Sequence, residues 1–262
     1  MDTSYDRRFG GIARLYGTAA LARFGQAHVC VIGIGGVGSW VAEALARSGI
    51  GQITLIDLDD ICVSNTNRQL PALAGQFGRM KVEATAERIL AINPECVVHQ
   101  IEDFVTTDNL EEMLGRGYDY VVDAIDSVKT KAAIINWCRR RKIPLITTGG
   151  AGGQTDPTQI KVDDLSRTTQ DPLAAKVRNI LRKDYGFAKP GKKFGVECVY
   201  STEPLAYPQT DGSVCATKPA VGDSPVRLDC EGGFGAVTVV TGTFGFVAAS
   251  RVLRKLADSA TQ

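Results

Sequence analysis

A strand, a glycine-rich turn and a helix follow one another near the start of the chain, and this arrangement restricts the fold more than any other feature. His28–Ile32 is an apolar run typical of a buried strand, and Gly33-Ile34-Gly35-Gly36-Val37-Gly38 follows it. Gly33 allows a tight turn, Gly35 allows backbone amides to approach a phosphate, and Gly38 allows the next helix to pack closely on the strand. The pattern predicts an α/β fold with a nucleotide at the turn.

An acidic residue ends the next predicted strand, Ile53–Ile56. Asp57 follows this strand directly, at the position from which a carboxylate accepts hydrogen bonds from ribose hydroxyls. The helix that begins near Ser39 directs its positive end at the same place. Glycine turns also join strands to helices in proteins that bind no nucleotide, but the strand context and the spaced acid favour a nucleotide site over a purely structural turn.

The length and charge are those of one globular domain. The chain has 262 residues and no Pro/Gly/Ser-rich linker, so we expect a single domain. Within it we expect a nucleotide-binding core over about residues 20–155, a basic and irregular substrate region over about 156–230, and an apolar helix over about 232–256. The net charge of +1 argues against a uniformly cationic surface, so any contact with nucleic acid has to be local.

The cysteine pattern indicates a reducing compartment. Seven cysteines are scattered without a Cys-x-x-Cys pair, so neither a zinc ribbon nor a disulfide framework is predicted. No apolar run follows the charged N-terminus, which argues against a secretory signal. The segment 232–250 is uncharged and mostly apolar. We expect it to be a buried helix in a cytoplasmic protein, with a membrane anchor as the less favoured alternative.

Strand-like and helical patterns alternate along the first part of the chain. This alternation predicts a mostly parallel, Rossmann-like sheet flanked by helices, with strands at Val29–Ile32, Ile53–Ile56, Val97–Ile101, Tyr120–Ala124 and Pro144–Thr147 and helices at Ser39–Arg47, Lys81–Ala91 and Val128–Arg141. Because ligands bind beyond the carboxyl ends of parallel strands, Gly35, Asp57 and Asp126 are expected to meet in one crevice. Beyond these elements we expect a helix and a basic loop over 163–193 and irregular structure over 194–229.

The residues after Asp57 favour phosphate chemistry over hydride transfer. Acids, amides and one arginine follow it closely, namely Asp59, Asp60, Asn65, Asn67, Arg68 and Gln69. Lys81 comes next, and Asp126 follows a predicted buried strand. A triphosphate requires cationic groups to neutralise its charge and a carboxylate to hold magnesium. A nicotinamide-dependent oxidoreductase and a nucleotide-sensing adaptor without turnover remain as alternatives.

These residues resemble the ThiF/MoeB-type adenylating enzymes, which are relatives of the ubiquitin-activating enzymes. The resemblance rests mainly on Ser64-Asn65-Thr66-Asn67-Arg68-Gln69 combined with Lys81 and Asp126; it covers about residues 8–150 and returns at 232–256. It implies that the nucleotide is ATP and that Mg²⁺ accompanies it. The implied nucleotide-binding residues are Gly33, Gly35, Gly36, Gly38, Asp57, Asp59, Asn65, Arg68, Gln69 and Lys81.

The resemblance also implies roles for individual residues. Asn65 and Arg68 would contact the triphosphate, Lys81 would bind phosphate and stabilise the pentavalent transition state, and Asp126 would hold Mg²⁺. Arg68, Lys81 and Asp126 are therefore the candidate catalytic residues. The family is dimeric, with an N-terminal arginine that reaches across to the partner subunit. Gly10-Gly11 stand where that family has Arg-Gln, so either Arg8 or Arg14 takes this role or the role is absent.

A basic segment in the second half of the chain is the candidate RNA contact. Only one acid, Asp184, interrupts a set of seven cations, Lys176, Arg178, Arg182, Lys183, Lys189, Lys192 and Lys193. Such a run suits an RNA backbone, although an ordinary solvated helix and loop has the same composition. A second cluster, Arg139-Arg140-Arg141-Lys142, lies at a predicted helix C-terminus, where positive charge complements the helix dipole.

With the Arg7–Gly11 start and the Gly149–Gln154 loop, these features resemble the tRNA threonylcarbamoyladenosine dehydratase branch of the family, called TcdA or CsdL. That branch implies ATP-dependent dehydration, by cyclisation, of threonylcarbamoyladenosine in tRNA through a carboxyl adenylate, with release of AMP and pyrophosphate. It also implies a homodimer and partners from a cysteine desulfurase system, namely the desulfurase and its sulfur-acceptor protein. The alternative is an adenylyltransferase that activates the C-terminus of a ubiquitin-like sulfur-carrier protein, which the missing Cys-x-x-Cys zinc pairs make less favoured.

Three cysteines lie where relatives place a catalytic or sulfur-transferring cysteine. They are Cys198, Cys215 and Cys230. A free cysteine is more often a small core residue than a nucleophile, so we expect a structural role for Cys230 in particular.

Overall fold

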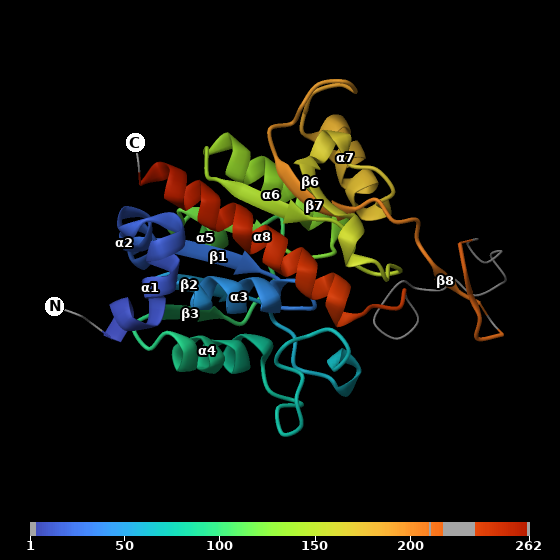
Figure 1. Ribbon diagram of the computed structural model, residues 1–262. Helices are drawn as coiled ribbons and strands as arrows, with labels where there is room; N and C mark the ends of the chain where they lie inside the picture. Colours follow the sequence, from blue (N-terminus) through green and yellow to red (C-terminus); the bar gives the residue numbers. More distant parts are fainter. Residues whose placement is uncertain (1–3, 210, 217–233, 261–262) are drawn as a thin grey trace.

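The computed structural model describes residues 4–209, 211–216 and 234–260. Within these residues seven strands form one sheet in the order β3-β2-β1-β4-β5-β7-β6 (Figure 1). The strands are β1 His28–Ile32, β2 Gln52–Ile56, β3 Val97–Ile101, β4 Tyr120–Asp123, β5 Leu145–Thr148, β6 Ile160–Asp164 and β7 Glu197–Ser201. Neighbours pair in parallel except β6, which runs antiparallel to β7. A short ribbon, β8 (Tyr207–Pro208) with β9 (Val214–Cys215), lies outside this sheet.

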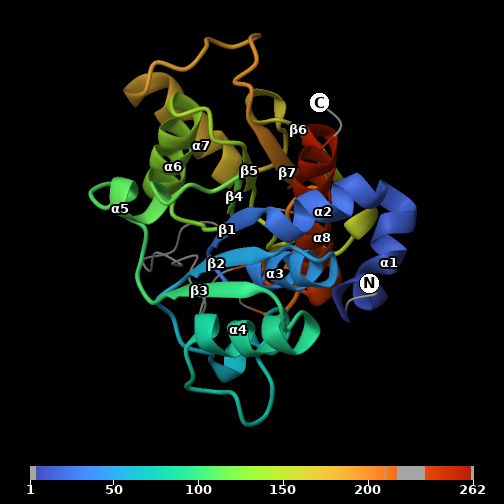
Figure 2. The ribbon, with the colours of Figure 1, turned by 90° about the vertical axis from the view of Figure 1, so that its left-hand side faces the viewer.

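Helices cover both faces of the sheet (Figure 2). They are α1 Ser4–Tyr16, α2 Thr18–Gln26, α3 Gly38–Arg47, α4 Lys81–Ile92, α5 Leu110–Leu114, α6 Val128–Arg140, α7 Pro172–Asp184 and α8 Thr238–Ser259, with 3₁₀ turns at Val63–Asn65, Pro157–Gln159 and Leu165–Arg167. One core joins α2, α3, α4 and α8 to the first face, and a second core joins α5 and α6 to the other. The fold is therefore the predicted mostly parallel, Rossmann-like sheet flanked by helices.

Alternating side chains of β1 enter the two cores. Val29 and Val31 belong to the core with α3 and α8, whereas Cys30 and Ile32 belong to the core with α6. All four are at most 1% exposed. A strand buried on both faces reads as a continuous apolar run, and this is why the pattern of the sequence predicted a parallel sheet at this point.

The predicted strands and helices of the first 150 residues are confirmed, with ends that shift by at most one residue. The expectation of irregular structure over 194–229 is wrong for β7, which is buried between β5 and β6. Glu197 and Ser201 make its sequence look polar, yet it pairs in parallel with β5. The edge strand β6 was also missed, because Lys161 and the acids at its end mask its apolar positions.

The C-terminal helix was expected over about 232–256 and is found at Thr238–Ser259. Its start is shifted because Val237 is extended, and residues 232–233 lie outside the described part. Gly245 brings α8 close to α3, since a Cβ added there would lie 2.7 Å from Trp40 Cβ and 2.8 Å from the Val37 carbonyl oxygen. Among the described helices, α8 included, none combines the length and apolar character that a membrane span requires.

Candidate active site

The order of strands reverses between β1 and β4, so the loops that follow these two strands lie side by side. A Cβ added to Gly33, after β1, would lie 3.0 Å from Ile125 Cγ2 and 3.1 Å from the Ala124 carbonyl carbon, after β4. In doubly wound sheets a ligand binds in the crevice outside such a reversal. The structure thus brings the glycine turn and the Asp126 loop together at one edge of the sheet, as the sequence predicted.

The glycine turn has two kinds of glycine. Gly33 has a φ of 84°, a left-handed conformation that favours glycine, and its amide donates to the Ile56 carbonyl over 2.9 Å. A Cβ on Gly38 would lie 1.8 Å from the Gly33 carbonyl oxygen, so this helix start requires glycine. A Cβ on Gly35 would find its nearest neighbour, Gln69 Nε2, at 3.9 Å. Gly35 therefore leaves open the space that a phosphate would need.

Asp57 ties the end of β2 to the glycine turn. Its Oδ2 accepts a hydrogen bond from the Ile34 amide over 2.6 Å, and its Oδ1 accepts one from the Asp59 amide over 2.9 Å. Burial raises the pKa of the Asp57 carboxyl above its usual value, while the nearby Lys81 ammonium and these hydrogen bonds oppose the shift. A carboxylate in this position retains lone pairs for ribose hydroxyls.

Lys81 begins α4 and is 5% exposed. Its Nζ lies 2.7 Å from Asp59 Oδ2, and its amide donates to the Asp59 carbonyl over 3.1 Å. The Asp59 side chain is half exposed. The structure thus brings together Asp57, Asp59 and Lys81, and a phosphate that binds Lys81 has to compete with the Asp59 carboxylate.

Arg68 lies across the glycine turn. Its Cγ would be 3.3 Å from a Cβ on Gly36. Its Nη1 donates to the Ser64 carbonyl over 2.8 Å and to Asn67 Oδ1 over 3.0 Å. The indole of Trp40, on α3, donates to the Arg68 carbonyl over 3.0 Å. Sequence reasoning did not find this supporting role of Trp40, which requires knowing that α3 faces the Arg68 segment.

Two amides beside Arg68 are buried. Asn65 Oδ1 accepts the Cys62 amide over 3.0 Å and so stabilises the 3₁₀ turn. Gln69 Oε1 is buried without a hydrogen-bond partner among the described residues, and Gln69 Nε2 lies beside Gly35. A buried amide oxygen without a partner, next to a cradle that a Cβ would narrow, fits the binding of a polar nucleotide.

Asp126 follows β4 and is exposed. Its carboxylate has no hydrogen-bond or ion-pair partner within the part of the chain that the structure describes. In the same residues no group of three or more His, Cys, Asp or Glu side chains is placed to hold a metal ion. A single carboxylate beside a triphosphate nevertheless fits Mg²⁺, which proteins often bind through one or two carboxylates together with phosphates.

A buried ion pair lies beneath the Asp126 loop. Lys131 Nζ is 2.9 Å from Asp123 Oδ2, and Thr147 Oγ1 donates to the same oxygen over 2.7 Å. This network joins β4, β5 and α6. The signal was present in the sequence, because Lys131 lies on the face of the predicted helix that carries Ile134 and Ile135, but the reasoning did not use it.

Asp171 is a second residue that the sequence reasoning missed. It caps α7, accepts the Ala174 amide over 2.9 Å, and accepts the Gly150 amide over 3.0 Å. A Cβ on Gly149 would lie 1.7 Å from Asp171 Oδ2. Burial raises the pKa of this carboxyl. The signal was Asp171-Pro172 ahead of a helix, a common N-terminal pattern.

A cavity of about 360 Å³ lies next to Asp171. Arg178 of α7 and Tyr207 of β8 are among the residues that line it. Arg178 donates to Thr168 Oγ1, and burial together with Arg182 lowers the pKa of its guanidinium. The cavity lies beyond the carboxyl end of β5, on the same edge of the sheet as the glycine turn.

The basic segment divides into two sets. Five lysines are exposed, Lys176, Lys183, Lys189, Lys192 and Lys193. Arg178 and Arg182 are half-buried, and Arg182 lies 5.1 Å from the ring centroid of Phe194. The two arginines therefore have partners inside the protein, whereas the five lysines form the accessible part of the candidate RNA contact.

The three cysteines in question differ in position. Cys198 lies in β7, is 1% exposed, and has a thiol pKa raised by burial, which disfavours the nucleophilic thiolate. Cys215 is exposed at the end of β9. Cys230 lies outside the described residues.

The chain matches the ThiF family over residues 5–262. It is 61% identical over 260 residues to the tRNA threonylcarbamoyladenosine dehydratase of Escherichia coli (strain K12), covering 99% of this chain and 97% of that protein. It is 60% identical over 255 residues to the Haemophilus influenzae (strain ATCC 51907 / DSM 11121 / KW20 / Rd) protein of the same name, covering 97% and 94%. Among solved structures, the E. coli enzyme, TcdA, in complex with ATP superposes with a TM-score of 0.87 at 57% identity, covering 98% of this chain and 96% of that one.

Proposed function

The chain belongs to the ThiF family, and on that premise we propose that it is a tRNA threonylcarbamoyladenosine dehydratase. It uses ATP to remove water from threonylcarbamoyladenosine in tRNA by cyclisation, with release of AMP and pyrophosphate. The observation that carries this proposal is the identity of 61% over nearly the whole length of both chains. The glycine turn with Asp57, Lys81 and Arg68 supports it, because it offers a complete set of groups for a nucleoside triphosphate.

The reaction begins with attack of the substrate carboxylate on the α-phosphate of ATP. The bond between the α- and β-phosphates breaks and pyrophosphate leaves, so that a carboxyl adenylate forms. A nucleophilic atom of the same modified group then attacks the activated carbonyl, AMP leaves, and a ring results. Because the second nucleophile belongs to the substrate, the step is intramolecular and needs no enzyme thioester.

The residues of the site have separate tasks in this proposal. Lys81 and Arg68 neutralise the charge that develops at the phosphates, and they act by electrostatics and positioning. The Asp57 carboxylate accepts hydrogen bonds from the ribose hydroxyls. Asn65 and Gln69 lie beside Arg68, and the turn from Gly33 to Gly38 holds the phosphates through its backbone amides.

Magnesium is proposed as the metal that accompanies ATP. Asp126 is the residue that would hold it, because its carboxylate is exposed, lacks a partner among the described residues and follows the strand next to the glycine turn. The ion would supply additional positive charge at the phosphates.

The five exposed lysines of the basic segment are proposed to contact the tRNA backbone. Because the net charge of the chain is only +1, attraction to RNA has to come from local groups of cations, and these exposed lysines form such a group. A second copy of this chain, as well as a cysteine desulfurase and its sulfur-acceptor protein, are proposed as further partners from the family resemblance alone.

The test is ATP-dependent AMP release with purified tRNA that carries threonylcarbamoyladenosine, followed by mass spectrometry of the nucleosides. We expect one AMP per nucleoside that has lost one water. The matched control is the same tRNA without the threonylcarbamoyl group, which should release no AMP. If neither product appears and a protein ending in Gly-Gly drives pyrophosphate exchange instead, the chain is a sulfur-carrier adenylyltransferase and the proposal is wrong.

A further inference from the structure

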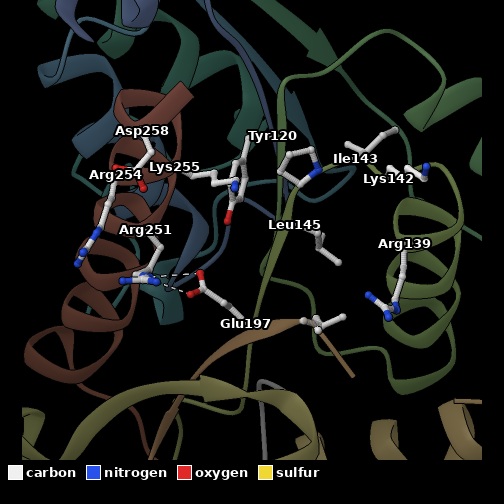
Figure 3. A pocket seen from close by; sticks show the side chains of 13 residues that line it. Tyr120, Arg139, Lys142, Ile143, Leu145, Glu197, Arg251, Arg254, Lys255 and Asp258 are labelled. Atoms are coloured by element: carbon white, nitrogen blue, oxygen red, sulfur yellow. Dashed lines mark hydrogen bonds and ion pairs between the residues drawn. The ribbon is translucent and has the colours of Figure 1, made fainter. Parts of the chain in front are cut away.

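A cavity of about 570 Å³ opens at the edge of the sheet opposite to the glycine turn (Figure 3). Its lining includes the first residues of three strands, Tyr120 of β4, Leu145 of β5 and Glu197 of β7. The C-terminal parts of α6 and α8 complete it. Since the candidate active site lies at the carboxyl ends of the strands, this cavity at their amino ends is a separate place.

Positive charge predominates around the cavity. The basic residues that line it are Arg139, Lys142, Arg251, Arg254 and Lys255, against the two acids Glu197 and Asp258. Arg251 and Glu197 form an ion pair, with Nε and Oε2 3.2 Å apart, and so largely neutralise each other. Figure 3 shows Arg139 and Lys255 directed into the cavity from opposite walls.

Helix dipoles explain part of this charge. Arg139 is in the last turn of α6, and Lys255 is one turn before the end of α8 at Ser259. Cations at such positions complement the partial negative charge of a helix C-terminus. A second observation is therefore needed to indicate a ligand.

Tyr120 provides it. The side chain is 3% exposed, and its hydroxyl makes no hydrogen bond with any residue that the structure describes. Figure 3 shows this hydroxyl directed into the cavity, toward the Arg251–Glu197 pair. Burial raises the pKa of Tyr120, so the group keeps its proton and remains a donor. The hydroxyl faces the open cavity without a partner among the described residues, so it is available to donate to a ligand, whereas phenylalanine would fill the same space without this donor.

We propose that this cavity binds a phosphate group, which accepts a hydrogen bond from the Tyr120 hydroxyl and is neutralised by Lys255 and Arg139. These three groups are all donors, and a phosphate offers several acceptor oxygens and a negative charge of more than one unit. The cavity also gives the basic cluster at the end of α6 a function beyond the helix dipole. The phosphate belongs either to an RNA backbone or to a free phosphorylated compound.

The first test is isothermal titration of the full chain with inorganic phosphate. A non-hydrolysable ATP analogue saturates the glycine turn, and ionic strength is held constant, so that neither the nucleotide site nor screening contributes. We expect saturable binding that Tyr120→Phe weakens about fivefold, the effect of one hydrogen bond, and that Lys255→Gln weakens about tenfold. Lys161→Gln, an exposed lysine of β6 away from the cavity, is the matched control and should bind phosphate as the parent does.

Thermal melting without phosphate shows whether each variant is folded, and melting with phosphate shows whether it binds phosphate. Tyr120→Phe retains the buried ring, so its melting temperature without phosphate should match the parent, while the increase that phosphate causes should be smaller. AMP release at saturating tRNA should be unchanged in both variants, because neither residue lies at the candidate active site. Absence of saturable phosphate binding in the parent, or equal affinity in parent, Tyr120→Phe and Lys255→Gln, would overturn the proposal.

A titration with tRNA distinguishes the two sources of phosphate. If the group belongs to an RNA backbone, Lys255→Gln lowers tRNA affinity and makes its salt dependence shallower by about one unit of the log–log slope. If it belongs to a free phosphorylated compound, Lys255→Gln leaves tRNA affinity unchanged while it still weakens phosphate binding. Either result supports the site, and neither depends on the dehydration reaction.

Discussion

Lys81 is paired with Asp59 in the structure, and a bound triphosphate requires its ammonium group to exchange that carboxylate for a phosphate oxygen. Asp57 is likewise engaged, through the amides of Ile34 and Asp59, and Arg68 donates to Ser64 and Asn67. Each of these three residues is therefore already held in place by a neighbour. At the scale of single residues, the site is positioned before ATP arrives, and this lowers the entropy cost of binding.

Replacement of Lys81 by alanine should stop the chemistry and leave the fold intact. Loss of one cationic group at the developing charge should lower the rate of AMP release by about 100-fold or more. The free energy of unfolding should change by only about 1–2 kcal/mol, because the partner Asp59 is half exposed. AMP release and chemical denaturation check the two expectations. Lys161→Ala is the control. Near-normal AMP release in Lys81→Ala would contradict the assignment of Lys81 as a catalytic residue.

The Asp57 carboxyl should make ATP affinity depend on pH. Burial raises its pKa in the folded protein, so the carboxylate becomes protonated, and loses acceptor capacity, at a pH above the usual value of about 3.9. The stability of the fold depends on pH in the opposite direction to ATP affinity. Ionisation of the buried group costs stability, and this cost is absent below the unfolded pKa and complete above the folded one.

Fluorescence titration with a labelled ATP analogue, repeated across the pH range in which Asp57 is expected to titrate, measures how ATP affinity depends on pH. Affinity should decrease as pH falls through the raised pKa in the parent. In Asp57→Asn it should be weak at every pH, because the amide does not titrate. An identical pH profile in parent and Asp57→Asn would show that another carboxyl governs the dependence.

The glycine turn and α3 form the unit that organises the site at the scale of elements. Gly38 is required for the close approach of α3 to β1, whereas Gly35 has room around it. The spacing predicted a glycine that lets α3 pack closely, which Gly38 confirms, and a glycine beside a phosphate, which stays a prediction for Gly35. Sequence alone located this turn because strand, turn and helix are local features. Sequence alone could not find β7, which pairs with β5 from a distant part of the chain, or the edge strand β6, which pairs with β7.

Two alanine substitutions separate these roles. Gly38→Ala should destabilise the protein by about 3 kcal/mol or more, because the new Cβ collides with a backbone oxygen that cannot move independently. Gly35→Ala should change stability by no more than about 1 kcal/mol and weaken ATP binding about tenfold, since the methyl group keeps a phosphate from the backbone amides. Denaturation and nucleotide titration of both variants are the measurements. Equal loss of stability in the two variants would contradict this division.

The whole molecule separates its charged surfaces between two edges of the sheet. The carboxyl edge carries the glycine turn, Lys81 and Asp126, and the amino edge carries the cavity at Tyr120. Composition predicted that nucleic-acid contacts have to be local, but not which cations are accessible. Arg178 and Arg182 were grouped with the lysines from spacing, and only the fold shows that both have internal partners.

Reversal of exposed charges in the basic segment should weaken tRNA binding without an effect on ATP. Lys189→Glu combined with Lys193→Glu should lower tRNA affinity about tenfold or more and reduce the slope of its salt dependence by about two. Arg116→Glu combined with Lys161→Glu reverses the same number of exposed charges elsewhere and should change both quantities less. Filter binding across a salt series tests this, and equal effects of the two pairs would indicate attraction by total charge alone.

The contacts between α8 and the Arg68 segment have a consequence for the order in which the protein is made. Asn67 donates to the Ala236 carbonyl, and Thr238 donates to the Asn67 carbonyl, 171 residues away in the chain. At ribosomal speeds of about 5–20 residues per second, roughly 10–35 s separate the synthesis of these two partners. A nascent chain therefore contains the glycine turn, Lys81 and Asp126 long before the Arg68 segment is secured. Competence to bind ATP should arise late in translation, and it then reports that almost the entire chain has folded.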